Sequence, residues 1–220
     1  MAPILAYWDI RGLAQPIRLL LEYTNTVFED KYYVCGEGPA YDKSCWFDIK
    51  FTLGLDFPNL PYYIDGEVKL TESSAILRYL ARQHNLLGTS EEERYRADIM
   101  EYSICDFRMA FVRLCYGPNF ETAKTKYLKA LPEHLKFFSE YLGSRKWFAG
   151  ENLTYPDFIA YEIFDQVLLL APSCLDEFPN IKRFQKQFEE LEPIKAYLAS
   201  SRCIKKRLNN RMAMFGSGVE

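Results

Sequence analysis

Apolar positions in the first third of the chain change their spacing several times, which predicts short strands and helices in alternation. The run Ile4 to Trp8 is typical of a short buried strand, and Pro16 precedes a leucine-rich helical segment. An Asp65-Gly66 pair interrupts a run of strand-forming residues and indicates a hairpin. We expect strands at Ile4 to Trp8 and Lys31 to Val34, a helix over Ile17 to Tyr23, a hairpin over Tyr62 to Leu70 and a helix over Ser73 to Gln83.

Beyond His84 the strand patterns disappear, and apolar residues recur at intervals of three and four. Ser90 can cap a helix whose first turn is rich in Glu, and residues 154–157 have the sequence of a capped helix start. Helices are expected over Glu91 to Tyr116, Phe120 to Leu142, Tyr155 to Leu170, Pro179 to Glu189 and Pro193 to Ser200. The pattern therefore predicts a small α/β domain over residues 1–83, a linker over 84–90 and an all-helical domain over 91–220.

The helix expected over Glu91 to Tyr116 carries apolar side chains on two faces. Residues 97, 100, 104, 107, 111 and 114 have the spacing of a core stripe. A second face consists of Cys105, Met109, Val112 and Tyr116. Two interpretations stay open: the helix is central in its bundle, or its second face lines a site for an apolar ligand.

The bulk composition is that of an ordinary globular protein, with 49% hydrophobic residues, 26% charged residues and a net charge of -3. This mild charge gives no reason to expect a nucleic-acid partner or an anionic membrane. The sequence has no signal-peptide pattern and no apolar run long enough to span a bilayer. The six cysteines, Cys35 and Cys45 among them, lack metal-site spacing and favour free thiols in a reducing, cytoplasmic compartment.

Tyr7 is the first candidate for chemistry, because it stands where the first strand turns toward the first helix. Such junctions are common ligand positions in α/β folds. A neutral hydroxyl directed at a thiol lowers the pKa of that thiol, because the hydrogen bond favours the ionised form. A Tyr in a first strand is more often a core residue, so this position alone leaves both roles open.

Two groups of residues could hold the carboxylates of a peptide-like ligand. Lys43, Trp46 and Lys50 offer two cations and an indole N–H, although a solvated charged surface has the same composition. Glu72 and Ser73 open a helix whose free N–H groups could bind a carboxylate or simply be capped.

Pro61 directly precedes the expected hairpin. A cis bond between Leu60 and Pro61 would turn the Leu60 backbone outward, where it could pair with an extended peptide ligand. A trans proline at the start of a strand is the commoner arrangement.

Several segments resemble mu-class glutathione transferases: Tyr-Trp-Asp-Ile-Arg-Gly-Leu at 7–13, Leu-Gly-Leu-Asp-Phe-Pro-Asn-Leu-Pro-Tyr at 53–62, and Ser-Ala-Ile-Leu-Arg-Tyr at 74–79. Residues 147–150 and 179–181 extend the resemblance into the second half. It implies a thioredoxin-like N-terminal domain, an all-helical C-terminal domain and a homodimer. The implied enzyme uses glutathione as co-substrate, needs no metal or other cofactor, and conjugates the activated thiol to hydrophobic electrophiles in detoxification.

The resemblance also implies roles for individual residues. Tyr7 is the catalytic donor to the glutathione sulfur, and Phe57 is the key that enters a pocket of the partner subunit. Met109 and Tyr116 line the electrophile site, which we expect to include Cys105 and Val112 of the second apolar face. The implied glutathione site comprises Trp8, Leu13, Lys43, Trp46, Lys50, Asn59, Leu60, Pro61 in the cis form, Glu72, Ser73 and Asp106 of the partner subunit.

Several residues depart from the family pattern, and these departures affect the expected preference for electrophiles more than the activation of the thiol. Glu72 stands where Gln is usual, Lys43 where Arg is frequent, and Phe107 and Arg108 where small polar residues or His are common. The segment from Arg202 to Met214 is basic and is either a solvated end or a surface that favours anionic ligands. A non-catalytic carrier of hydrophobic anions on the same fold is the main alternative function.

Overall fold

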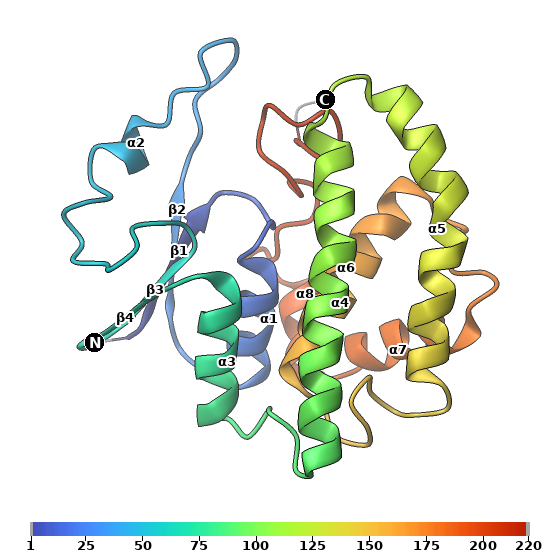
Figure 1. Cartoon of the computed structure of the whole chain (residues 1–220). Coiled ribbons are helices and arrows are strands. Elements are labelled where there is room, and N and C mark those ends of the chain that lie inside the picture. The colour runs from blue at the N-terminus through green and yellow to red at the C-terminus, as the bar shows by residue number, and fades with distance from the viewer. Residues whose placement is uncertain (1, 219–220) are drawn as a thin grey trace.

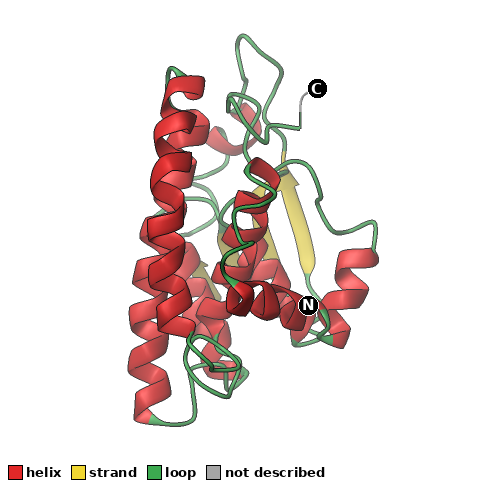
Figure 2. Cartoon of the chain, turned by 90° about the vertical axis from the view of Figure 1, so that its right-hand side faces the viewer, coloured by secondary structure: helices red, strands yellow, loops and turns green. Residues whose placement is uncertain are grey.

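A four-stranded sheet forms one side of the molecule, as Figures 1 and 2 show. The computed structural model describes residues 2–218. The strands are β1 (Ile4–Trp8), β2 (Glu29–Tyr33), β3 (Tyr62–Asp65) and β4 (Val68–Thr71), in the spatial order β2-β1-β3-β4. Strand β1 is parallel to β2, with Tyr7 opposite Tyr32, and antiparallel to β3. Tyr7 therefore lies near the end of a central strand.

Two helices, α1 (Gln15–Tyr23) and α3 (Ser73–Gln83), lie between the sheet and the long helix α4 (Figure 1). Leucines at positions 19, 20 and 21 of α1 are fully buried, as the apolar pattern predicts. Strand β2 begins two residues before the expected position. The short helix α2 (Ser44–Phe47) was not expected, because its start depends on a local contact in which the Asp42 carboxylate accepts hydrogen bonds from Ser44.

The second half of the chain is helical: α4 (Glu91–Tyr116), α5 (Phe120–Leu142), α6 (Tyr155–Leu170), α7 (Pro179–Glu189) and α8 (Glu192–Ala199). These bounds agree with the predicted helices, except that α8 begins and ends one residue earlier. The core stripe of α4 is buried, and α6 is buried around almost its whole circumference, which makes α6 the centre of the bundle. Within residues 2–218 no helix combines the length and apolarity needed to cross a membrane.

The helix starts use the caps that the sequence predicts. The Ser90 hydroxyl accepts a hydrogen bond from the Glu93 backbone N–H at 3.1 Å. Fully buried Asp157 accepts hydrogen bonds from the Thr154 N–H at 2.8 Å, the Thr154 hydroxyl and the Phe148 N–H at 3.0 Å. Its burial raises the pKa of the Asp157 carboxyl to about 6, against these hydrogen bonds.

Buried ionic contacts join the two halves of the chain. The Arg11 guanidinium, on the loop after β1, donates to Glu162 on α6 at 2.7 and 2.9 Å and to Asp165 at 2.6 Å. Arg78 on α3 contacts Glu101 on α4 through its Nε at 2.6 Å. The loop that follows Tyr7 is thus fastened to the helical bundle.

Candidate functional site

A cavity of about 210 Å³ opens between the end of β1 and the C-terminal half of α4. Tyr7 and Leu13 form one side, and Met109, Val112 and Tyr116 form the other. The second face of α4 therefore lines a cavity while its first face lies in the core. The centre of the bundle is α6 rather than α4, and the second face as a site for an apolar ligand stays a prediction.

The loop after β1 fixes the position of the Tyr7 ring. The Arg11 backbone N–H donates to the Arg207 carbonyl at 2.7 Å, and the Gly12 N–H donates to the Leu208 carbonyl at 3.1 Å. Gly12 has a φ of +43°, a conformation that favours glycine. The C-terminal segment and the loop together hold the Tyr7 hydroxyl at the cavity wall.

Tyr7 is 7% exposed, and this burial raises the pKa of its hydroxyl above the ordinary value. A hydrogen bond from the Leu13 backbone and the positive charges of Arg108 and Arg18 oppose the rise. The phenol therefore stays protonated at neutral pH. Because its oxygen accepts from Leu13, its own proton is available for a ligand.

Tyr116 forms a second phenol of the same kind on the opposite wall. Its oxygen accepts a hydrogen bond from the Asn210 backbone N–H at 2.6 Å. Burial raises the pKa of Tyr116 to about 12, and the Asn210 hydrogen bond partly offsets the rise. The cavity thus has two neutral hydroxyl donors on facing elements.

Arg108 and Asn209, two residues that the family resemblance places near the electrophile site, line this cavity together with Gln166, which sequence reasoning missed. Gln166 donates to Glu162 at 2.5 Å and so connects the wall to the Arg11 ion pair. Nothing in the sequence marked this Gln, because its role depends on a contact with the N-terminal loop. Cys105 is not among the lining residues, and its sulfur is 4.0 Å from Nη2 of Arg108.

The candidate residues for one ligand carboxylate, Lys43, Trp46 and Lys50, lie outside the cavity, around helix α2. Trp46 is 3% exposed and stacks on Tyr62, with ring centroids 6.0 Å apart. The Lys50 ammonium lies 5.0 Å from the Phe51 ring centroid, and half-buried Lys43 directly precedes α2. Half-buried Trp8 makes an edge contact with Tyr33 from the end of β1.

The segment before β3 contains a cis peptide bond. The Leu60–Pro61 bond is cis, the isomer that the family resemblance implies. The exposed Asn59 side chain accepts a hydrogen bond from the Leu60 N–H at 2.9 Å through its Oδ1. A second cis bond, between Gly38 and Pro39, was not predicted.

Helix α3 begins with free backbone donors. Glu72 precedes it with a φ of +65° and caps no backbone group with its side chain. The first N–H groups of α3, from Ser73 onward, therefore have no side-chain cap at Glu72, and N–H groups at a helix start attract an anion. The exposed Glu72 carboxylate forms no ion pair within residues 2–218.

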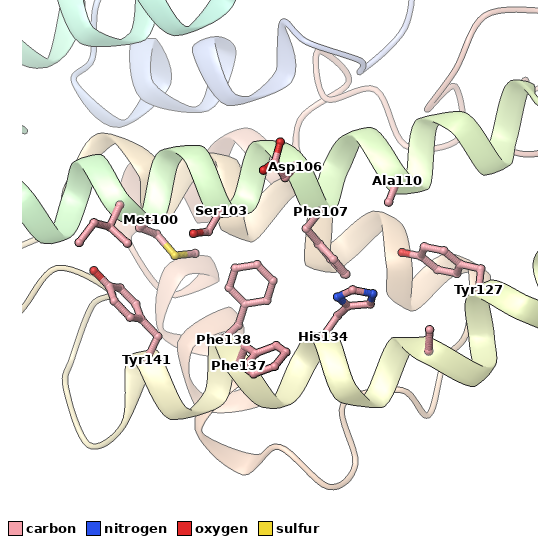
Figure 3. A pocket seen from close by; sticks show the side chains of 12 residues that line it. Met100, Ser103, Asp106, Phe107, Ala110, Tyr127, His134, Phe137, Phe138 and Tyr141 are labelled. Atoms are coloured by element: carbon pink, nitrogen blue, oxygen red, sulfur yellow. The ribbon is translucent and has the colours of Figure 1, made fainter.

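A larger cavity, about 430 Å³, lies between α4 and α5 (Figure 3). Its wall is mostly apolar and aromatic, with Phe107, Phe137 and Phe138 among the lining residues. Asp106 also lines it, on the side of α4 away from Tyr7. Phe57, in the loop before β3, is 77% exposed and does not contribute to either cavity.

The basic segment after α8 is largely paired with acidic residues of the N-terminal half. Arg202 forms an ion pair with Glu22, Arg207 contacts the Asp9 carboxylate at 2.8 Å, and Arg211 lies 3.5 Å from Glu37. The pairing indicates that these cations fasten the segment to the N-terminal half. The interpretation as a purely solvated end therefore does not describe these three residues.

The chain matches two family models: "Glutathione S-transferase, N-terminal domain" over residues 3–82 and "Glutathione S-transferase, C-terminal domain" over residues 105–201. It is 58% identical to rat (Rattus norvegicus) glutathione S-transferase Mu 5 over 97% of this chain and 95% of the relative. Human (Homo sapiens) glutathione S-transferase Mu 3 is 56% identical with the same coverage. Among solved structures, the glutathione S-transferase Blo t 8 superposes with a TM-score of 0.88 at 34% identity, covering 97% of this chain and 99% of that chain. The pi-class glutathione S-transferase of Onchocerca volvulus has a TM-score of 0.86 at 32% identity, with coverage of 97% and 100%.

Proposed function

Because this chain belongs to the glutathione S-transferase family, and within it to the mu class, its reaction is glutathione conjugation, and we propose that Tyr7 activates the thiol. The observation that carries this assignment is the buried Tyr7 hydroxyl at the wall of the 210 Å³ cavity. Its raised pKa keeps it a neutral donor. The close relatives are named as transferases, which favours catalysis over the carrier function.

The proposed chemistry uses the Tyr7 proton without transferring it. The glutathione thiol loses its proton to solvent, and the Tyr7 O–H donates a hydrogen bond to the thiolate sulfur. This charge-assisted bond lowers the thiol pKa, and a fall of about two units corresponds to about 2.7 kcal/mol. The sulfur then forms a bond to the electrophilic carbon, which loses a leaving group with its electron pair in a substitution, or whose π bond opens and takes up a proton from solvent in an addition. The cavity holds the two reactants in contact.

The remainder of glutathione lies along the sheet edge in this proposal. The backbone of Leu60, beside cis Pro61, pairs with the cysteinyl portion as an added strand would, and its N–H then leaves the Asn59 Oδ1 that it contacts at 2.9 Å. The free N–H groups at Ser73 bind the γ-glutamyl carboxylate, and exposed Glu72 receives its ammonium. Trp8 and Leu13 flank the ligand, Lys43, Trp46 and Lys50 hold the glycine carboxylate, and Asp106 of the partner subunit reaches the γ-glutamyl end.

The electrophile occupies the α4 side of the cavity. Met109 and Val112 provide an apolar wall, and Cys105 lies one turn before Met109 on the same helix. The Tyr116 hydroxyl accepts a hydrogen bond from Asn210 and keeps its own proton. It can therefore donate a hydrogen bond to an oxygen of the electrophile that becomes negatively charged during the reaction.

We propose a homodimer in which Phe57 of one protomer enters the α4–α5 cavity of its partner. Phe57 is 77% exposed, and an exposed large apolar side chain is typical of an interface anchor when its partner offers an apolar cavity. The cavity is lined by aromatic side chains that converge on its centre (Figure 3). This arrangement would place Asp106, which lines the same cavity, at the subunit boundary.

The proposed division of the chain is a thioredoxin-like glutathione domain over 1–83, a linker over 84–90 and a helical domain over 91–220. Six free cysteines suit the reducing conditions of the cytoplasm, where we place the enzyme. Glutathione is the co-substrate, and the proposed reaction uses no metal.

The test compares the wild-type protein with Tyr7→Phe in conjugation of glutathione to 1-chloro-2,4-dinitrobenzene over a range of pH. The expected result is a clear wild-type rate and a large loss in the variant that becomes smaller as pH rises and more thiol ionises. Tyr32→Phe, the strand neighbour opposite Tyr7, is the matched control and should retain the wild-type rate. Equal rates for wild type and Tyr7→Phe at all pH values would contradict the assignment.

A further inference from the structure

Arg108 is a buried cation on the wall of the Tyr7 cavity. The residue is 8% exposed, and its Nε has no hydrogen-bond partner among residues 2–218. Its Nη2 makes a weak contact, 4.0 Å from the sulfur of Cys105. The side chain forms no ion pair within the part of the chain that the structure describes.

The two other buried arginines near the site are paired. Arg11 forms an ion pair with Glu162 at 2.7 Å, and Arg18, whose Nη2 has no hydrogen-bond partner among residues 2–218, forms one with Asp30 at 2.8 Å. A buried charge without a partner is unfavourable, and proteins generally keep such groups only where something else compensates them. The difference between Arg108 and its two neighbours therefore points to a ligand as the missing partner.

Arg108 also differs from everything around it in the cavity. The other lining residues are neutral, and the polar ones are Tyr7, Tyr116, Gln166 and Asn209. Arg108, Val112 and Tyr116 are spaced four residues apart on α4, so they lie on one face of the helix. A guanidinium on that face stands beside the apolar wall and the second phenol.

Two negative groups could pair with this guanidinium: the glutathione sulfur or an oxygen of the electrophile. The sulfur already has the Tyr7 hydroxyl, which Leu13 holds in place. A guanidinium placed beside the sulfur would lower the pKa of the thiol, and it would lower the nucleophilicity of the thiolate at the same time. Because Arg108 belongs to the same helix face as Val112 and Tyr116, the geometry favours the electrophile.

We propose that Arg108 is a further catalytic residue, which binds the oxygen that becomes negative when glutathione adds to α,β-unsaturated ketones and aldehydes. This proposal rests on the proposed role of the Tyr7 cavity. The thiolate sulfur forms a bond to the β-carbon, the C=C electron pair shifts, and the carbonyl oxygen becomes an enolate oxygen. Arg108 donates hydrogen bonds to that oxygen, and the enolate then takes a proton from solvent, equal to the one that the thiol released.

The test is a comparison of two electrophiles in the full-length protein. The ketone trans-4-phenyl-3-buten-2-one gains charge on an oxygen, whereas benzyl chloride has no oxygen and loses its halide on the side opposite the sulfur. In Arg108→Met we expect kcat/KM to fall about 100-fold with the ketone and to stay within about threefold with the chloride. Arg108→Lys should recover part of the ketone rate, since it keeps the charge but lacks the planar fork.

Arg113→Met provides the control, because Arg113 is an exposed cation on the same helix, and both of its rates should equal those of the wild type. The pKa of bound glutathione, measured from the ultraviolet absorbance of its thiolate, shows whether Arg108 pairs with the sulfur instead. An equal loss with both electrophiles together with a higher thiol pKa would overturn the proposal, because Arg108 would then act on the sulfur. Unchanged rates in Arg108→Met would overturn it as well. A wild-type protein that conjugates neither electrophile would contradict the proposed role of the Tyr7 site, and this outcome is distinct from the failure of the Arg108 proposal.

Discussion

The backbone of Gly12 packs directly against the Tyr7 side chain. A Cβ at position 12 would lie 2.6 Å from Cε1 of Tyr7 and 2.8 Å from its hydroxyl oxygen, closer than non-bonded atoms approach. Gly12 is thus a spacer that sets where the phenol can stand. The hydroxyl that we assign to catalysis is positioned by the absence of a side chain.

Gly12→Ala should therefore displace the Tyr7 ring and reduce activity much more than stability. We expect kcat/KM for 1-chloro-2,4-dinitrobenzene to fall on the order of 100-fold, because a shift of about 1 Å at a catalytic group has such an effect. Gly66→Ala is the matched control: its φ is +58°, so it bears a similar strain, but an added Cβ there meets nothing within 4 Å. Equal activity in the two variants would show that Gly12 does not position Tyr7.

Arg11→Met should destabilise the protein by about 3–5 kcal/mol, because it leaves Glu162 buried without its main partner. The free energy of unfolding in urea, measured at one fixed protein concentration, tests this expectation. Arg202→Met removes a guanidinium that is 63% exposed and paired with Glu22, and should cost less than about 1 kcal/mol. A similar loss in both variants would argue against a special role for the buried pair.

Glu93 should make stability depend on pH in the acid range. Its carboxylate is 7% exposed and accepts hydrogen bonds from Thr89 and Asn152, which lower the pKa to about 2 although burial opposes the fall. Because the folded pKa lies below the unfolded one, the stabilisation is complete above the unfolded pKa and is lost as pH falls through the folded pKa. Between pH 7 and pH 3 the wild type should lose about 2 kcal/mol more than Glu93→Gln in urea unfolding. Parallel pH profiles for the two proteins would contradict this expectation.

Phe57→Ser should weaken the proposed dimer without unfolding the protomer, because it removes the exposed ring that we place in the α4–α5 cavity. Sedimentation velocity over a range of concentrations should show a larger monomer fraction than in the wild type. Phe51→Ser is the matched control, since Phe51 is also 77% exposed and lies in the same connection between α2 and β3. If both variants sediment like the wild type, another surface must hold the protomers together.

The sequence predicted the helices well because their signals are local. Periodicity and caps such as Ser90 and Thr154 act within one or two turns, and the structure places the helix bounds accordingly. Helix α2 escaped prediction because it is too short to have a period. The Tyr7 position could be proposed from its strand-to-helix context, with the family resemblance supplying its role.

The contacts that hold the site in place were beyond the reach of sequence patterns. Arg11 and Glu162 are separated by 151 positions, and each has the appearance of an ordinary surface charge in the sequence. Gln166 reaches the cavity only because α6 lies against the first loop, through the contact of Glu162 with Arg11. Such residues need a pairing between distant segments before their function is visible.

The hydrogen bonds from Arg11 and Gly12 to the carbonyls of Arg207 and Leu208 also impose an order on biosynthesis. The strand and loop that carry Tyr7 leave the ribosome well before the segment around residues 207–208 that anchors that loop. A nascent chain can therefore form its sheet well before Tyr7 is fixed in place. A product truncated before residue 207 would possess Tyr7 without the contacts that hold its loop in place.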